Sequence, residues 1–199
     1  MEKIDPAWIT ENFISLIGRE WMLVTAGDAS RFNTMTASWG GVGYLWNKPV
    51  VFVFVRPERY TFEFIERCDC FTLSFLCEEY REAYKVCGSR SGRDTDKVKE
   101  AGLVPFVTPL GNVTFEQSRL TLECRKLYTG ITAEERFIDK SIYRKGPRAE
   151  TIGCTWPRSW TVGSSKPSVR CFRRLRTNPR SRKKCCFYAY LFGLLNKKR

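Results

Sequence analysis

Two arginines, a tyrosine and a threonine follow directly on an apolar run in the stretch "VVFVFVRPERYT". The run from Val50 to Val55 is short and β-branched, which predicts a strand buried on both faces. Pro57 lacks the N–H that a ladder needs and ends this strand. Thr61 is the expected N-cap of a following helix, so arginines and a helix N-terminus together predict an anion site. Taken alone, the fragment favours a simpler interpretation, a strand-to-helix turn with solvated arginines.

The chain contains no histidine, which excludes Ser–His–Asp and Cys–His catalysis and a Cys₂His₂ zinc site. Its C-x-C pair (Cys68 and Cys70) and its adjacent pair (Cys185 and Cys186) lack the C-x-x-C spacing of a zinc site. We therefore expect no metal. No Walker A or G-x-G-x-x-G motif is present, so a cofactor is expected to carry any chemistry, and no catalytic side chain is assigned.

Cysteine usage and the N-terminus bear on the compartment. The nine cysteines are an odd number, and "MEKIDPAWIT" does not resemble a secretory signal. The apolar run 187–195 is too short to span a bilayer. We therefore expect a cytoplasmic protein without a membrane span. The first five cysteines are expected to be reduced thiols, mostly in the core: Cys68, Cys70, Cys77, Cys87 and Cys124.

The positive charge is confined to the C-terminal part of the chain. The formal net charge is +13, but residues 1–143 contain 18 Lys and Arg against 20 Asp and Glu. Residues 144–199 contain 16 basic residues and one acid, Glu150. This division predicts a domain over residues 1–143 and a basic, atypical tail over 144–199. A solvated, disordered tail is favoured over an arm that binds nucleic acid or anionic lipid.

Strands alternate with short helices along the first 143 residues, without regular βαβ units. Strands are predicted over 20–27, 32–41, 50–55, 70–76 and within 113–130. Helices are predicted from their capping residues: one after Asp5 and Pro6, one over 78–88 ending at Gly88, one from Asp94 to Gly102, and one after the capping box of Thr132 and Glu135. This pattern indicates an α+β, mainly β protein with an antiparallel barrel or sandwich.

A family resemblance rests on three linked stretches in order, "FNTMTASWGGVGYLWNKPVVFVFVRPERYTFEFIE", "FTLSFL" and "CGSRSGRDTDK". Over roughly residues 10–142 the chain resembles the flavin reductase-like family. The resemblance implies an antiparallel FMN-binding split β-barrel that forms a homodimer and holds FMN near the dimer interface. It also implies an NAD(P)H-dependent flavin reductase, whose flavin is used directly or passed to a partner oxygenase. The alternative is a split-barrel protein that binds flavin or haem without turnover.

The resemblance also assigns cofactor-binding residues. The strand beside the flavin ring would be Asn33, Thr34, Met35, Thr36, Ala37, Ser38 and Trp39, where small side chains let the backbone approach the ring edge. The phosphate site would comprise Arg56, Arg59, Tyr60 and Thr61, with a loop of Ser91, Gly92 and Arg93 closing over the flavin. The residues alone also allow two simpler interpretations. The strand over 33–39 could alternate with its hydroxyls facing solvent, and Tyr60 could pack in the core. Trp39 and Trp46 would either touch the ring or, as large aromatic side chains near a barrel rim, pack in the core, which is favoured. Lys48 and Lys97 are expected to be solvated.

The tail departs from the family where a late strand resembling "Y-H-x-M-Y-x-G-E-I" is expected. The stretch "ETIGCTWPRSWT" (150–161) can be encoded by permitted codons that, when read from the third base, give N-H-R-M-Y-M-A-K-I-V-D. This match supports the hypothesis that the reading frame slipped between about residues 141 and 150. The resulting barrel would lack a strand and bind flavin weakly.

Overall fold

A computed structural model describes residues 2–144, 153–155 and 169–173 of the chain. The predictions for Cys185, Cys186 and the apolar run 187–195 lie outside the described residues.

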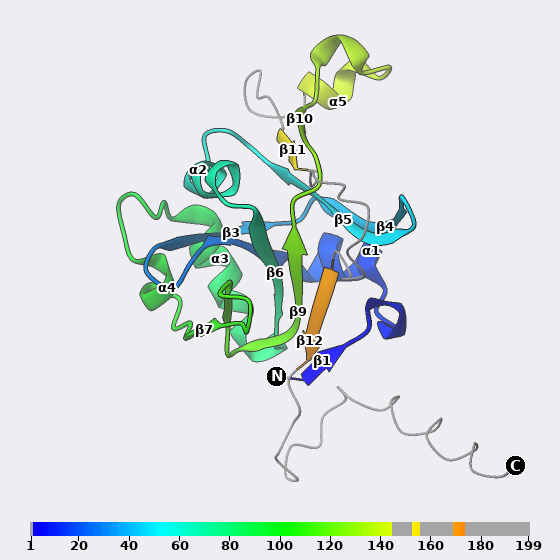
Figure 1. The fold of residues 1–199 in the computed structure, drawn as a ribbon. Helices are drawn as coiled ribbons and strands as arrows, with labels where there is room; N and C mark the ends of the chain where they lie inside the picture. The colour runs from blue at the N-terminus through cyan, green and yellow to red at the C-terminus, as the bar shows by residue number, and fades with distance from the viewer. Residues whose placement is uncertain (1, 145–152, 156–168, 174–199) are drawn as a thin grey trace, which may run out of the picture.

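The largest sheet is antiparallel and contains six strands in the order β1-β12-β9-β6-β2-β3 (Figure 1). Its strands are β1 (Glu2–Ile4), β2 (Met22–Gly27), β3 (Phe32–Ala37), β6 (Cys70–Leu76), β9 (Ser118–Arg125) and β12 (Val169–Arg173). The turn between β2 and β3 forms at Gly27 and Asp28, as the sequence predicts. Gly27 has a φ of 114°, and the Asp28 carboxylate accepts from the backbone N–H of Ser30 at 2.8 Å.

The second sheet has four antiparallel strands in the order β10-β11-β5-β4. Its strands are β4 (Gly40–Leu45), β5 (Lys48–Val55), β10 (Thr129–Ile131) and β11 (Gly153–Thr155), while β7 (Pro105–Val107) pairs with β8 (Val113–Phe115). The β5 side chains alternate. Val51, Val53 and Val55 are buried, but Phe52 and Phe54 are partly exposed, so the prediction of burial on both faces was wrong for one face.

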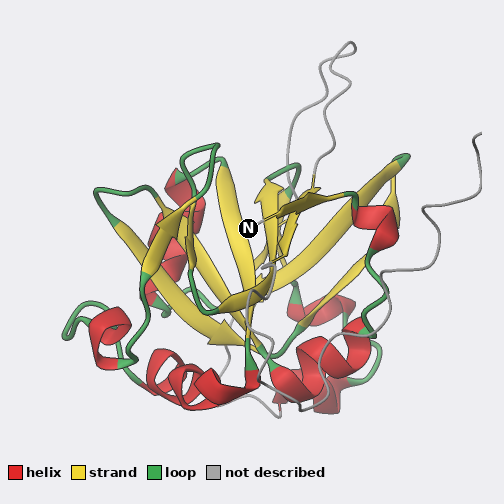
Figure 2. Cartoon of the chain, turned by 90° about the horizontal axis from the view of Figure 1, so that it is seen from below, coloured by secondary structure: helices red, strands yellow, loops and turns green. Residues whose placement is uncertain are grey.

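The two larger sheets enclose one apolar core, which confirms the predicted antiparallel barrel. Met22 and Val24 of β2 meet the valines of β5 and the inward face of β6 and β9. The largest fully buried side chains include Phe71, Phe75 and Leu122. A second cluster lies outside the barrel, where Leu23 and Leu76 pack against Tyr84 and Cys87 of α3 (Arg81–Ser89). Most helices lie together on one side of the strands (Figure 2).

The helices are short and differ from the predictions mainly at their ends. They are the 3₁₀ helices η1 (Pro6–Trp8), η3 (Glu78–Tyr80) and η4 (Glu134–Arg136), the π-helix η2 (Leu16–Glu20), and α1 (Phe13–Ser15), α2 (Tyr60–Arg67), α3, α4 (Lys97–Glu100) and α5 (Lys140–Arg144). Asp5 caps η1 as predicted, but no single helix follows. Ile9 is extended, and the side chain of Asn12 caps a new helix by accepting from the N–H of Ile14 at 3.1 Å.

Several predicted caps were wrong because the helices begin or end at neighbouring residues. Asp96, not Asp94, caps α4 and accepts from the N–H of Lys99 at 3.1 Å. Gly88 lies inside α3, which ends with Arg90 as its C-cap. The N-cap of η4 is Ala133, which makes no side-chain capping bond, so the predicted N-cap position at Thr132 was one residue early.

Two segments of the basic tail pair as strands, where the sequence analysis expected none. β11 lies between β10 and β5, and β12 lies between β1 and β9. Both segments therefore add strands to the two larger sheets. The division into a domain over residues 1–143 and a tail over 144–199 stays a prediction.

The five cysteines of the main domain are free thiols. Cys87 and Cys124 are buried, but Cys68, Cys70 and Cys77 are partly exposed, so the prediction of a mostly core location was wrong. Within the described ranges, no set of three or more acidic or cysteine side chains could hold a metal ion. Among the same residues, no helix is both long and apolar enough to cross a membrane.

Candidate functional site

β3 offers mainly its backbone to a ligand. It is the last strand in the order of the six-stranded sheet, so one row of its N–H and C=O groups has no ladder partner among the described strands. Its side chains are largely committed elsewhere. Met35 and Ala37 belong to the barrel core, and the hydroxyl of Thr34 pairs with that of Thr25 at 2.8 Å.

Thr36 and Ser38 lie near the C-terminal end of β3, beside α3. The Thr36 hydroxyl donates to the carbonyl oxygen of Tyr84 at 2.5 Å. A Cβ at Gly88 would lie 3.4 Å from the Cβ of Thr36, so the helix packs closely on the strand. Ser38 is exposed and lies just beyond the last residue of β3.

Arg56 and Trp39 meet at the end of β5. The Arg56 guanidinium lies over the Trp39 ring, 5.5 Å from its centroid, and also pairs with Glu58 at 3.8 Å. Trp39 is 50% exposed, and Trp46 is 45% exposed, so the expected core role of both was wrong. A stacked arginine beside an exposed aromatic ring could accommodate a planar or anionic group.

Arg59 is the N-cap of α2 and is half-buried. Its Nη2 donates to the carbonyl oxygen of Gly88 at 2.8 Å, and no carboxylate among the described residues forms an ion pair with it. Burial lowers the pKa of the Arg59 guanidinium; Glu58 opposes this change and Arg56 adds to it. Arg59 therefore carries a charge that lacks a full counter-charge.

The prediction that Thr61 caps α2 was wrong, because a tertiary contact uses its side chain. α2 begins at Tyr60, and Thr61 lies inside the helix with no exposed surface. The Thr61 hydroxyl accepts from the side-chain amide of Asn33 at 2.7 Å. The N-terminus of α2 consequently has no side-chain cap.

The loop of residues 91–93 closes onto the N-terminal half of α2. The Arg93 guanidinium lies 4.7 Å from the ring centroid of Tyr60, pairs with the carboxylate of Glu63, and donates to the carbonyl of Glu58 at 3.3 Å. Ser91 orients the loop, because its hydroxyl accepts from the N–H of Arg93 at 3.2 Å.

Two cavities adjoin these residues. The larger, of about 650 Å³, lies between the β2–β3 turn and the loop that leads into α4, and its walls include Asn33, Gly92 and Arg93. The smaller, of about 300 Å³, is lined by Thr36, Ser38 and Arg59, together with Trp21, Tyr84, Lys85 and Gly88.

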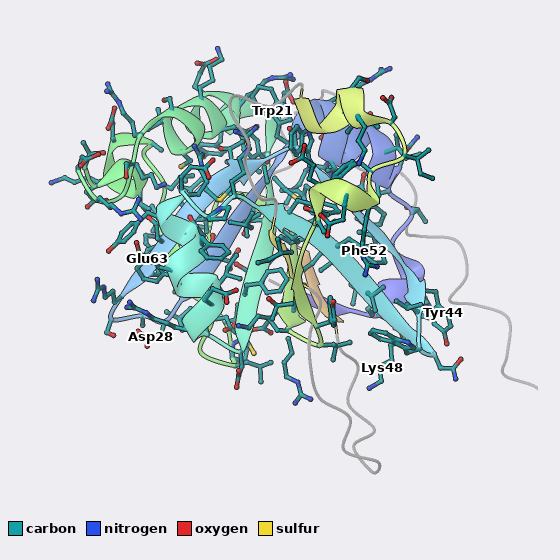
Figure 3. The ribbon with its side chains drawn as sticks, turned by 90° about the horizontal axis from the view of Figure 1, so that it is seen from above. Trp21, Asp28, Tyr44, Lys48, Phe52 and Glu63 are labelled. Atoms are coloured by element: carbon teal, nitrogen blue, oxygen red, sulfur yellow. The ribbon has the colours of Figure 1, made fainter. Side chains whose placement is uncertain are left out.

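Figure 3 shows Asp28 and Glu63 on one side of the molecule, with Tyr44, Lys48 and Phe52 of β4 and β5 on the other.

The structure thus divides the predicted site residues into groups. Six of them line the two cavities, and Arg56, Trp39 and Tyr60 lie on the adjoining surface. Ser91 lines neither cavity and bonds within its loop. The side chains of Thr34, Met35, Ala37 and Thr61 are buried in packing contacts.

Sequence reasoning missed Arg31 and Lys97. Arg31 lines the larger cavity and its guanidinium donates to the Tyr60 hydroxyl at 3.1 Å; its position just before β3 was the available signal. Lys97 was expected to be solvated, but only 4% of it is exposed. Its burial follows from packing between α3 and α4, which no local pattern reveals.

Solved structures with the same fold are flavin proteins by their names. A flavoredoxin from Methanosarcina acetivorans is 19% identical, with a TM-score of 0.55 over 87% of this chain and 76% of that chain. An FMN-binding protein from Thermus thermophilus is 18% identical (TM-score 0.52; 80% and 76% covered). An NADH:FAD oxidoreductase from Streptomyces globisporus C-1027 is 14% identical (TM-score 0.52; 78% and 75% covered). The fold is therefore the FMN-binding split β-barrel.

A family model described as the flavin reductase like domain matches residues 14–134, more than half of the chain. The chain belongs to the flavin reductase like domain family, which confirms the resemblance seen in its sequence. No curated protein matches it.

Proposed function

We propose that the protein binds FMN and acts as an NAD(P)H-dependent flavin reductase. The observation that carries the proposal is the open backbone edge of β3 beside an uncapped helix N-terminus and two arginines, Arg56 and Arg59. Family membership and the flavin-binding relatives support the same ligand.

The residues present fit FMN at both of its ends. The phosphate needs donors, and Arg59 has a half-buried guanidinium without an ion-pair partner among the described residues, while the first N–H groups of α2 lack a side-chain cap. The ring edge needs backbone donors close by, and residues 35–37 belong to β3, whose outer edge is open among the described strands, with Ser38 just beyond them. Thr61 would contribute its backbone N–H only, because its hydroxyl is engaged by Asn33.

A bound FMN supplies hydride exchange with a nicotinamide ring, so no side chain has to act as acid or base. The chain's task is to bind and orient. Backbone N–H groups of β3 would polarise the ring edge, and Arg56 and Arg59 would hold the phosphate. Arg93 keeps the loop against Tyr60. Ser91, Gly92 and Arg93 would cover one side of the ligand and exclude water from it.

We also propose that the protein is a homodimer that could supply reduced flavin to a partner oxygenase. Exposed aromatic side chains support a dimer interface at the β4 side of the barrel, where Trp39, Trp46 and the 72% exposed Tyr44 lie close in sequence. Light scattering after size exclusion should give twice the chain mass, and a monomer of full activity would contradict the dimer.

The test of the main proposal is reconstitution with FMN followed by anaerobic mixing with NADH and with NADPH. Bleaching of the flavin absorbance by either nicotinamide is expected. Tight flavin binding without bleaching would favour the alternative, a flavin-binding protein without turnover. Absence of flavin binding would refute the proposal.

A further inference from the structure

Lys97 is a buried lysine without a carboxylate partner among the described residues. Only 4% of it is exposed, and its Nζ donates to the carbonyl oxygen of Arg90 over a long 3.4 Å. A buried ammonium group ordinarily has a counter-ion, because a carbonyl dipole replaces only part of its hydration.

The groups around Lys97 add little negative charge. Burial, opposed by the thiol of Cys87 and reinforced by the positive charge of Arg59, lowers the pKa of Lys97 to about 8. Arg59 donates to the carbonyl oxygen of Gly88, and Lys97 donates to the carbonyl oxygen of Arg90. Two cationic side chains therefore lie at the C-terminal end of α3. The partial negative charge of a helix C-terminus, about half an elementary charge, cannot balance both.

A cavity of about 650 Å³ adjoins Lys97. Arg31, Arg93 and the exposed Lys99 line it as well, so four cationic residues border it. Of these, Arg93 already pairs with the carboxylate of Glu63. Asp94 and Asp96 are its acidic residues, but the carboxylate of Asp96 already caps α4. The volume is many times that of a single water molecule, about 30 Å³ in the liquid, and is sufficient for a small phosphorylated molecule.

We propose that Lys97 is a ligand-binding residue whose ammonium group pairs with a phosphate group held in this cavity. Phosphate suits the site because it brings nearly two negative charges and several acceptor oxygens to a cavity bordered by four cationic residues. The source of the phosphate rests on the proposed function: it is either the phosphate of FMN or a phosphate of the nicotinamide dinucleotide.

Ribose 5-phosphate tests the site without a flavin ring. Its charge is nearly constant above pH 7, because the second pKa of a phosphate monoester is about 6. Binding measured by calorimetry should therefore follow Lys97 and weaken about tenfold or more between pH 7.5 and pH 9.5. This series uses the unaltered chain.

Lys97→Met removes the charge and keeps a flexible apolar side chain, and it should fold because it removes a buried cation. It should weaken ribose 5-phosphate about 10- to 100-fold at pH 7.5 and abolish the pH dependence. Lys140→Met is the control, since Lys140 is an exposed lysine of α5 that is not among the residues lining either cavity. It should change binding less than about threefold.

Two further titrations of Lys97→Met identify the source of the phosphate. Weaker FMN binding with unchanged riboflavin binding assigns the site to the flavin, and weaker NADP⁺ binding to the FMN-loaded protein assigns it to the dinucleotide. Equal effects of Lys97→Met and Lys140→Met, or ribose 5-phosphate binding that does not change with pH, overturn the inference. A chain that binds ribose 5-phosphate through Lys97 but no flavin would refute the proposed function alone.

Discussion

The side-chain amide of Asn33 donates to the hydroxyl of Thr61 at 2.7 Å, and both residues are buried. This bond joins β3 to α2, and so joins the strand proposed to hold the flavin ring to the helix proposed to hold its phosphate. This neutral hydrogen bond therefore helps to fix the relative position of the two elements, together with the bond from Arg31 to the Tyr60 hydroxyl at 3.1 Å.

Thr61→Val should lower the free energy of unfolding by about 1–3 kcal/mol, because it leaves a buried amide of Asn33 without an acceptor. Urea denaturation followed by circular dichroism measures this. Thr10→Val, at an exposed position, is the control and should change little. An unchanged midpoint for Thr61→Val would mean that the bond does not stabilise the fold.

Replacing both Arg56 and Arg59 by alanine should weaken FMN binding more than riboflavin binding. Each lost charge-assisted contact reduces the binding free energy by about 1.5–3 kcal/mol. The loss applies to FMN and not to riboflavin, because only FMN carries a phosphate. Fluorescence titration with the two flavins gives the ratio. Arg67→Ala, at the exposed C-terminal end of α2, should leave the ratio unchanged. Equal losses for both flavins would show that these arginines do not bind the phosphate.

Ser38→Leu should expel the flavin while the far-ultraviolet circular dichroism stays nearly unchanged. Ser38 is exposed and lines the smaller cavity, so a bulky side chain there obstructs the ligand without disturbing the core. Ser141→Leu, exposed in α5, controls for added surface hydrophobicity. If Ser38→Leu keeps flavin at unaltered affinity, β3 does not line the ring.

Lys97 should make stability rise with pH between about 8 and 10. Its pKa is about 8 in the folded protein against 10.5 as the ordinary value. Between these values the unfolded chain binds the extra proton, so raising the pH favours the folded state. The buried thiol of Cys87, with its pKa raised to about 11, acts oppositely above pH 9.

The contribution of Lys97 is isolated by comparing the unaltered chain with Lys97→Met over the same pH range, since Cys87 is common to both. Thermal denaturation should show the difference between them shrinking as the pH rises from 7 to 10. A constant difference would mean that Lys97 does not titrate in this range.

Resequencing the gene across the codons for residues 141–161 tests the frame hypothesis. An out-of-frame His-x-Met-Tyr segment is expected there. The restored chain should bind flavin more tightly and remain more soluble, because a complete late strand would cover the barrel edge. If the other frame encodes no such segment, the tail needs a function of its own.

The strands were predictable because their signal is local. Alternating and continuous apolar runs located β2, β5 and β6 within two residues of their observed bounds at every end. Helix ends were less predictable. Thr61 looks like a capping residue in sequence, but a partner 28 residues away takes its hydroxyl.

The candidate site was only partly predictable for the same reason. The cationic residues Arg56 and Arg59 stand out beside the end of a strand, but the burial of Lys97 depends on how α4 packs against α3. Trp39 shows the reverse error. Its size favours a core position, yet the chain leaves it half exposed under the guanidinium of Arg56.

The loop of residues 91–93 carries an evolutionary constraint. A Cβ at Gly92 would lie 2.1 Å from Oδ1 of Asn33, far inside van der Waals contact. Every glycine codon is one base change from an alanine codon, so the offending methyl group is always within mutational reach. Such a change would push the loop off β3 unless position 33 shortened at the same time. In a lineage of such proteins, positions 33 and 92 should therefore change together or stay fixed together.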